Sequence, residues 1–360
     1  MAYTTIDDPS AYFQTALYTG NGSSNHAITF DGNSNMQPDW IWNKSRSIAD
    51  SHALFDSTRG INKILYSNVD LVESTDTNGN LESFDSNGIT VGGNQEYANK
   101  SGSSQITWAW KANGGTRTTF TESGNNPGGG RQVNTTAGFS IIDYTGTGSA
   151  GTIEHGLGAV PHLILFKARS EASNDWAVYH QGNTSAPETD FLRLNTNGAT
   201  TDNSNFMNDT APTSSVFTVN TGSKVNSDGE TYIAYCFSEK QGYSKFGSFT
   251  GNGNVNGPFI YTGFKPAFGI FKRTDTTGNW YMMTGKIGDD GQDGNPLEDR
   301  LEANTTAAEA DMGQGYDFLS NGVKVRHDGG EINGSGNSFI YMIWAEHPFV
   351  SSKGVPTTAR

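Results

Sequence analysis

The chain has 360 residues, a formal net charge of −14 and only 17% charged residues, and much of its polarity comes from 45 glycines together with Asn, Ser and Thr. This acidic balance disfavours binding to nucleic acid or to anionic membrane surfaces, which needs clustered Lys and Arg. No window holds the roughly 20 apolar residues of a membrane helix. Short apolar runs rich in aromatic residues alternate with Asn-Gly and Asp-Gly turns, a profile typical of an all-β protein.

Residues 1–15 form an N-terminal leader, which we expect to be one helical turn or an arm that docks on a partner. The leader lacks the basic start and apolar stretch of a signal peptide. We therefore expect synthesis in a host cytoplasm, with export only as part of a larger particle. At the other end, residues 350–360 form a polar tail that we expect to be extended.

One pattern occurs three times along the chain. Each copy opens on an aromatic residue and a glycine turn, continues with a proline, an apolar run and a lysine, and closes on an aromatic-rich run. The openings are 18–22, 144–148 and 249–253; the proline-to-lysine runs are 38–44, 161–167 and 266–272; the closing runs are 106–110, 233–237 and 340–344. The copies lie roughly 100 to 125 residues apart, a period that suits a small domain and exceeds a solenoid turn or a propeller blade.

We therefore predict a tandem array of three related β-sandwich modules of jelly-roll character. Module one spans 16–112, module two 138–239 and module three 246–349. Segment 113–137, rich in glycine and asparagine, is expected to be a flexible linker or a long surface loop. Only 240–245 separates modules two and three, so these two should pack together.

Each module should also contain a hairpin just before its closing strand. The signals are an aromatic strand that breaks at a glycine turn, at 84–89, 217–222 and 318–323. Asn-Gly between β-forming residues is a strong short-range hairpin signal. Each module then has about six to eight short strands, enough for two packed sheets.

Several motifs resemble functional sites, and for each we favour a structural role. Residues 146–151 match G-x-G-x-x-G, but the dinucleotide site needs a helix to begin there, and 152–161 cannot be helical. The acidic loop 289–298 fails the EF-hand spacing because Gly291 takes the third ligand position, so a solvated loop is the default and cation binding there stays open. We expect His155 to cap a turn rather than to bind a metal.

No catalytic, cofactor-binding or metal-binding residues can be assigned, and the ligand-binding residues are unknown. Cys236 is the single cysteine, so no intrachain disulfide is possible, and it lies in an apolar strand with no visible partner base. Glycoside hydrolysis needs two acids that face each other across a groove. The acids within strands, such as Glu346, sit at strand ends where solvent is near.

The seven tryptophans could stack sugar rings or fill a core. Most lie inside the repeated apolar runs, with Trp40 and Trp42 on one strand face and the same alternation at 108 and 110. Core packing is the better explanation. Trp176 and Trp280, which follow loops at matching positions, have the best claim to partial exposure.

The motifs together resemble a domain family of unknown function that is common in predicted virion proteins of marine bacteriophages. The resemblance covers nearly the whole chain, and segment 155–161 is also similar to phage tail-fibre proteins. Module one departs from the pattern, with 26–30 in place of the His-Gly-Leu-Gly element, so its role could differ, for example in attachment to the particle. The resemblance rests on the openings and on 3–9, 155–169, 208–217 and 242–251.

The resemblance implies a location on the virion exterior and no reaction. We therefore expect a non-enzymatic virion protein, a tail fibre or similar appendage that contacts the host surface and its glycans. The alternatives are an architectural head-decoration or vertex protein without a receptor and, less favoured, a glycan depolymerase. Expected partners are other virion proteins, a host receptor and further copies of the chain in a trimer, with no nucleic acid, membrane or cofactor.

Overall fold

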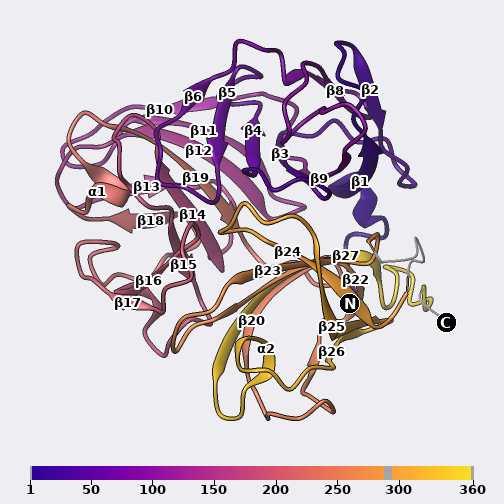
Figure 1. The fold of residues 1–360 in the computed structure, drawn as a ribbon. Coiled ribbons are helices and arrows are strands. Elements are labelled where there is room, and N and C mark those ends of the chain that lie inside the picture. The colour runs from indigo at the N-terminus through magenta and orange to yellow at the C-terminus, as the bar shows by residue number, and fades with distance from the viewer. Residues whose placement is uncertain (1, 288–293, 358–360) are drawn as a thin grey trace.

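The computed structural model describes residues 2–287 and 294–357, where nearly every regular element is a strand (Figure 1). The exceptions in this part of the chain are single turns of helix: η1 (Pro9–Ala11), η2 (Pro187–Thr189), α1 (Ser223–Asn226) and α2 (Gly330–Asn333). No helix among the described residues has the length and apolar character that crossing a membrane requires. The all-β prediction is confirmed.

The first large sheet has six antiparallel strands, and a three-stranded sheet packs against its outer face. In spatial order the large sheet contains β1 (Phe13–Thr19), β9 (Ser104–Trp110), β3 (Trp40–Ser45), β4 (Ala53–Asp56), β5 (Lys63–Tyr66) and β6 (Ser74–Thr75). The small sheet contains β2 (His26–Thr29), β8 (Gly88–Val91) and β7 (Leu81–Asp85).

The second large sheet has eight strands, and a two-stranded sheet packs on its outer face. The large sheet runs β10 (Thr118–Phe120), β11 (Gly129–Asn134), β12 (Phe139–Thr145), β19 (Thr231–Phe237), β14 (Leu163–Ala168), β15 (Ala177–His180), β16 (Asp190–Arg193) and β17 (Thr201–Asp202). The small sheet pairs β13 (Gly151–Glu154) with β18 (Val216–Val219).

The third large sheet also has eight strands, and it curls so that β25 and β26 pack against β22. Its order is β20 (Ser244–Thr250), β27 (Ser338–Pro348), β22 (Phe264–Arg273), β23 (Trp280–Thr284), β24 (Leu297–Glu302), β25 (Ala310–Leu319), β26 (Gly322–Val325) and β21 (Phe259–Tyr261). β21 therefore lies at an edge of this sheet.

The three large sheets repeat one order of pairing. The opening strand pairs with the closing strand, which pairs with the strand that carries the proline-to-lysine run, and a meander follows: β1-β9-β3-β4-β5-β6, β12-β19-β14-β15-β16-β17 and β20-β27-β22-β23-β24-β25. In each case a further strand pairs with the strand that precedes the closing one (β2–β8, β13–β18 and β21–β26). The three repeated sequence segments thus have matching connectivity.

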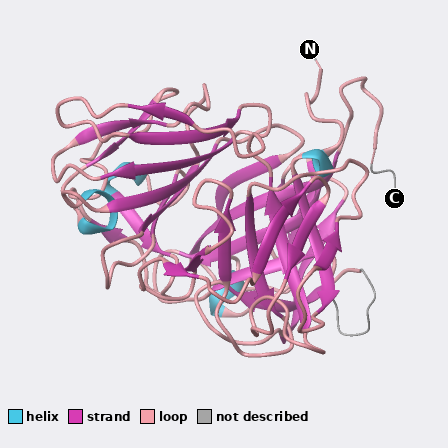
Figure 2. Cartoon of the chain, turned by 90° about the horizontal axis from the view of Figure 1, so that it is seen from above, coloured by secondary structure: helices cyan, strands magenta, loops and turns pink. Residues whose placement is uncertain are grey.

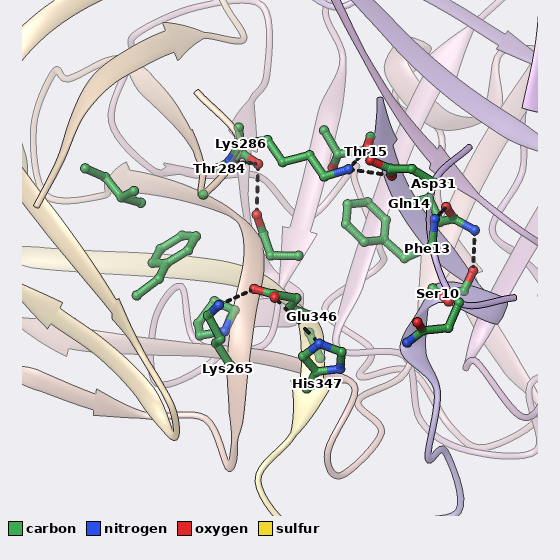
Figure 3. Close-up of a pocket in the computed structure, with 18 of the residues that line it drawn as sticks. Ser10, Phe13, Gln14, Thr15, Asp31, Lys265, Thr284, Lys286, Glu346 and His347 are labelled. Carbon is green, nitrogen blue, oxygen red and sulfur yellow. Dashed lines mark hydrogen bonds and ion pairs between the residues drawn. The ribbon is translucent and has the colours of Figure 1, made fainter. Parts of the chain in front are cut away.

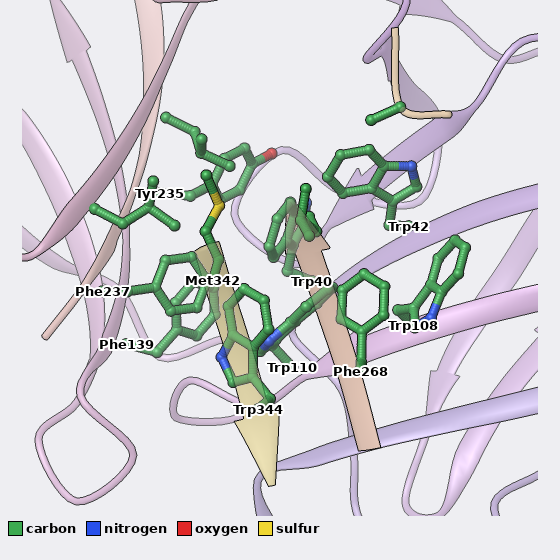
Figure 4. Close-up of a cluster of buried hydrophobic side chains, with 14 of the residues drawn as sticks. Trp40, Trp42, Trp108, Trp110, Phe139, Tyr235, Phe237, Phe268, Met342 and Trp344 are labelled. Carbon is green, nitrogen blue, oxygen red and sulfur yellow. The ribbon is translucent and has the colours of Figure 1, made fainter. Parts of the chain in front are cut away.

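The inner faces of the three large sheets meet in one central core (Figures 1, 2 and 4). At its centre Trp110, Phe237 and Trp344, from β9, β19 and β27, lie edge to face with centroid separations of 5.3 to 6.3 Å. The outer faces bury three smaller clusters against the remaining strands. The sheets therefore pack face to face as in a sandwich, but a series of self-contained modules would have separate cores, and here the inner faces share one.

Segment 113–137, expected to be a linker or loop, instead adds strands β10 and β11 to the second sheet. β-pairing uses backbone N–H and C=O groups, which a polar sequence supplies as well as an apolar one. Its glycines allow close approach, since a Cβ on Gly129 would lie 2.0 Å from the carbonyl oxygen of Asp143. Composition alone therefore gave the wrong prediction for this segment.

The described parts of the leader and the tail contact the rest of the protein. The leader contains the expected helical turn, η1, and it docks on the same chain, where Thr4 Oγ1 donates to the carbonyl oxygen of Gln241 at 2.7 Å. The tail, expected to be extended, turns back through a bridge between Val350 and Pro356. The Ser352 hydroxyl donates to the Asp7 carboxylate at 2.5 Å and so ties the tail to the leader.

Two of the three predicted hairpins form. The Asn-Gly turns join β7 to β8 and β25 to β26, with Asp85 opposite Gly88 and Leu319 opposite Gly322. The segment 217–222 is an exception, because α1 follows β18 and no strand returns. This segment lacks the Asn-Gly pair and has no β-branched residue directly after its glycine.

Candidate functional site

The repeated glycine turns have a structural explanation. A Cβ on Gly146 would lie 2.1 Å from the carbonyl oxygen of Ser227, and Gly148 has a φ of 65°, which favours glycine. The buried Asn226 side chain accepts a 2.8 Å hydrogen bond from the Thr147 backbone N–H. The corresponding residues elsewhere are Gly20, Gly22 and Asn99, and Gly251, Gly253 and Asn333.

The G-x-G-x-x-G match at 146–151 therefore does not form the phosphate site of dinucleotide-binding proteins, in which a helix begins at this turn. Gly151 begins strand β13, so no helix N-terminus follows the turn. The sequence-based preference for an ordinary turn is confirmed at this point.

The lysine that ends each proline-to-lysine run is buried where two large sheets meet. The ammonium groups of Lys44, Lys167 and Lys272 donate to backbone carbonyls. One acceptor of each belongs to another sheet, in the segment after β24, β5 or β16: Thr306 at 3.4 Å, Asp70 at 3.1 Å and Asn197 at 3.4 Å, respectively. Burial lowers the pKa of each lysine to about 8.

Trp176 and Trp280 are fully buried at the same junctions, so the expectation of partial exposure was wrong. The indole N–H of Trp176 donates to the carbonyl oxygen of Tyr66 at 2.8 Å, and that of Trp280 donates to Arg193 at 2.9 Å. Each acceptor is the last residue of a strand in another sheet, Tyr66 of β5 and Arg193 of β16. The two indole side chains therefore face a neighbouring sheet rather than solvent.

His52 takes the corresponding place in the first sheet. Its Nδ1 accepts from the Trp42 indole at 2.8 Å, so Nε2 carries the proton and donates to the carbonyl oxygen of Glu302 at 3.0 Å. Glu302 ends the fifth strand of the third sheet. The hydrogen bonds of Trp176, Trp280 and His52 therefore join the second sheet to the first, the third to the second and the first to the third. Together they connect the three sheets in a closed cycle.

The remaining sequence candidates are structural. His155 Nδ1 accepts from the Leu157 backbone N–H at 3.2 Å, which confirms its role as a turn cap. Cys236 is buried in β19, and burial raises the pKa of its thiol. Of the acidic loop 289–298, residues 289–293 lie outside the described residues. Among the residues that the structure does describe, no three His, Cys, Asp or Glu side chains are grouped as a metal site would require.

A cavity of about 460 Å³ lies between the first and third sheets and is the candidate functional site (Figure 3). One wall comes from η1, β1 and the loop after β2; the other comes from β22, residues 284–286, residues 294–297 and β27. Its buried surface is partly apolar, with Phe13, Leu297 and Phe318 among its lining residues.

The charged groups of the cavity are arranged in pairs. Lys286 Nζ contacts the Asp31 carboxylate at 2.7 Å and also donates to the carbonyl oxygen of Thr15 at 2.9 Å. The first pair therefore joins the two walls. Within the third-sheet wall, Lys265 Nζ lies 2.8 Å from Glu346, and His347 Nε2 lies 3.6 Å from the same carboxylate (Figure 3). Glu346 is 42% exposed, which agrees with the expectation that solvent is near it.

Neutral polar groups complete the lining. The Gln14 amide is buried and bridges three backbone groups, with its Nε2 donating to Ser10 and Ser34 and its Oε1 accepting from Gly32. The Thr15 hydroxyl is buried and has no hydrogen-bond partner among the described residues. A hydroxyl left in this state costs free energy unless water or a ligand satisfies it.

This arrangement suits binding of a polar, uncharged molecule. Each rim carboxylate already contacts an ammonium group, and donors and acceptors are interspersed among apolar side chains such as Phe13, Leu297 and Phe318. Cavities with a few convergent polar groups on apolar walls are the usual form of a small-molecule site. The sequence analysis named Glu346 without a role and missed the others, because the lining comes from segments more than 200 residues apart that only the shared core brings together.

Comparison with known proteins gives a family but no activity. A search of curated proteins finds no match. A family model described as a domain of unknown function, DUF7483, matches residues 8–348, which covers all three large sheets. The chain belongs to the DUF7483 family.

Proposed function

We propose that this chain is a non-enzymatic attachment protein of a bacteriophage virion, a tail fibre or similar appendage, whose cavity holds a saccharide of the host surface. The virion location is supported by the sequence resemblance described above. The binding role is supported by the cavity between the first and third sheets. The two parts are separate and can be tested separately.

We also propose that the protein consists of three copies of one β-sandwich unit with jelly-roll-like pairing of its outer strands. The matching strand orders support this proposal. The buried lysines at corresponding positions, and Trp176, Trp280 and His52 at the contacts between sheets, support it too. Three units that close on a shared core make a rigid body, because each junction is fixed by directional hydrogen bonds as well as by apolar packing. Rigidity suits attachment, since little entropy is lost when a preformed surface binds.

The observation that carries the saccharide assignment is the pairing of charges at the cavity rim. With Asp31 bound to Lys286 and Glu346 bound to Lys265, the rim offers hydrogen bonds of both kinds without an excess of charge. A sugar ring presents hydroxyl groups at its edge and C–H groups on its faces. The hydroxyls match the donors and acceptors of the rim, and the C–H faces match the apolar side chains among the lining residues.

The test is binding of the purified chain to host cells and to their isolated envelope saccharides. The variant Gly285→Trp fills the cavity, since a Cβ at this lining residue meets no atom within 4 Å. The matched control is Gly198→Trp, which is remote from the cavity and whose Cβ meets only the Thr196 hydroxyl at 3.4 Å. We expect Gly285→Trp to abolish binding and Gly198→Trp to leave it intact.

Two other outcomes distinguish the alternatives. An architectural head-decoration or vertex protein would bind neither cells nor saccharide. A depolymerase would release reducing ends from the saccharide, and a single substitution such as Glu346→Gln would stop the release. The expected homotrimer stays a prediction that light scattering tests, and a monomer at micromolar concentration would contradict it.

A further inference from the structure

A second candidate surface lies on the outer face of β21, β26 and β25. Phe259 and Tyr261 of the edge strand β21 are 46% and 54% exposed, and Leu319 at the end of β25 is 36% exposed. Residues two apart on a strand point to the same side. The buried Ile260 between them points into the third outer cluster, so both rings point outward.

The register brings these side chains together. Tyr261 lies opposite Gly322, which in turn lies opposite Leu319, and Phe259 lies opposite Lys324. A Cβ on Gly322 would be 2.8 Å from the Phe259 ring, so this ring leans over the glycine. Phe259, Tyr261 and Leu319 therefore surround a bare stretch of backbone, and we name this surface the aromatic platform.

Neighbouring contacts hold the platform in place. The Tyr3 hydroxyl lies 3.3 Å from the Tyr261 hydroxyl and donates to the carbonyl oxygen of Gly263 at 2.8 Å, so the leader braces the ring of Tyr261. Preorganised rings lose little conformational entropy when a ligand binds.

The platform also has a positive charge. The Lys324 ammonium donates to the carbonyl oxygen of Gly257 and has no carboxylate partner among the described residues, because the nearby Asp317 pairs with Arg326 at 2.7 Å. The chain as a whole has a net charge of −14, so the Lys324 ammonium beside two exposed aromatic rings distinguishes this surface from an average acidic one. It complements a ligand that carries a carboxylate next to an apolar face.

The corresponding strands of the other two sheets lack this combination. In β2 the outward positions are Ala27 and Thr29, and in β13 they are Thr152 and Glu154. Since the buried isoleucine between each pair is kept in all three strands, the fold does not require aromatic residues at the outward positions. The rings at 259 and 261 are therefore specific to the third sheet.

We propose that the aromatic platform binds acidic polysaccharide, with a carboxylated pyranose stacked on Phe259 and Tyr261 and its carboxylate next to Lys324. A pyranose ring offers a C–H face that packs against aromatic rings. Its carboxylate would be the negatively charged partner that the Lys324 ammonium lacks within the described part of the chain. This site is separate from the cavity and binds charged sugar residues, whereas the cavity suits uncharged ones. It shares with the proposed function only the class of ligand.

The experiment is calorimetric titration of the full chain with oligogalacturonate and with the same oligomer fully methyl-esterified. We expect binding of the acid form that weakens with salt, and weaker binding of the neutral ester. The double variant Phe259→Ala/Tyr261→Ala should lower affinity for both forms by about tenfold or more. Lys324→Gln should lower affinity for the acid form only. The matched control, Thr29→Ala on β2, should change neither.

Each other outcome is informative. Unchanged affinity for the acid form in the double variant, with an unchanged melting temperature, overturns the proposal. If Gly285→Trp abolishes oligomer binding and the platform variants do not, the cavity hypothesis survives and this inference fails. If light scattering instead shows a dimer that the double variant dissociates, the platform is an interface between copies and the glycan proposal is wrong.

Discussion

The Trp176 indole donates a 2.8 Å hydrogen bond to the backbone carbonyl of Tyr66, and this contact joins the second sheet to the first. Trp280 joins the third sheet to the second in the same way, and His52 joins the first sheet to the third. A linear series of domains would leave one of these contacts unmade. Because all three form, the stability of each sheet should depend on its neighbours.

Replacing Trp176 with Phe should destabilise the protein by about 1–3 kcal/mol, because the partly buried carbonyl of Tyr66 loses this donor. Trp40→Phe is the matched control, since the Trp40 indole N–H has no partner among the described residues. Urea unfolding measures both variants. If both variants lose the same free energy of unfolding, the hydrogen bond from Trp176 to Tyr66 contributes nothing beyond the packing of the indole.

The buried lysines should make stability rise with pH. Burial lowers the pKa of Lys44, Lys167 and Lys272 to about 8 in the fold, against an ordinary value of 10.5. Between these values the unfolded chain binds more protons than the folded chain, so the free energy of unfolding increases as pH rises from about 8. The measurement is urea unfolding from pH 7.5 to 9, where few tyrosines with the ordinary pKa of 10.0 are ionised.

The variant Lys167→Met should reduce this slope by about one third, because it removes one of three equivalent groups. Lys265→Met is the control, as this lysine lies at the cavity rim with 41% exposure and should leave the slope unchanged. A flat profile in the unmodified chain would contradict the burial of ammonium groups at the junctions.

Acid should weaken the junction between the second and third sheets. His180 Nε2 donates to the carbonyl oxygen of Tyr341 at 3.1 Å, Nδ1 accepts from Gly182, and burial lowers its pKa to about 4. Below the ordinary pKa of 6.5, His180 is protonated in the unfolded chain but stays neutral in the folded chain. The free energy of unfolding therefore falls as pH drops from 6.5 to 4. His180→Gln should reduce the slope of this part of the profile, as measured by thermal unfolding in a pH series. Burial also lowers the pKa of three other histidines, which contribute to the same slope: His52, His155 and His162. A profile with the same slope in the variant would assign the acid sensitivity to other groups.

The glycine turns should tolerate no side chain at their first glycine. Gly146→Ala places a Cβ 2.1 Å from a backbone oxygen and should cost several kcal/mol, on the order of a severe core substitution. Gly285→Ala, where the added Cβ meets nothing within 4 Å, should stay within about 0.5 kcal/mol of the original chain. Differential scanning calorimetry compares the two. Similar melting temperatures would mean that the turn can relax without strain.

Much of the local structure follows from the sequence because its causes are local. Asn-Gly pairs predict the turns at Gly88 and Gly322, and alternation places Trp40 and Trp42 on one strand face. The burial of Cys236 and the capping role of His155 also follow from short segments. The failure at 113–137 has a physical reason, since backbone pairing does not need apolar side chains and composition therefore cannot detect it.

An all-β chain with one pattern of turns, strands and lysines repeated three times can be predicted from the amino-acid sequence, because hydrophobic alternation and glycine conformation act over a few residues. Three features become visible in the folded chain alone: the inner faces of the sheets share one core, Trp176 and Trp280 are buried, and residues of η1, β1, β22 and β27 line a cavity. These features depend on contacts between segments up to several hundred residues apart. Such contacts form only when packing of the three sheets removes a large apolar area from water, and no local pattern records which faces meet.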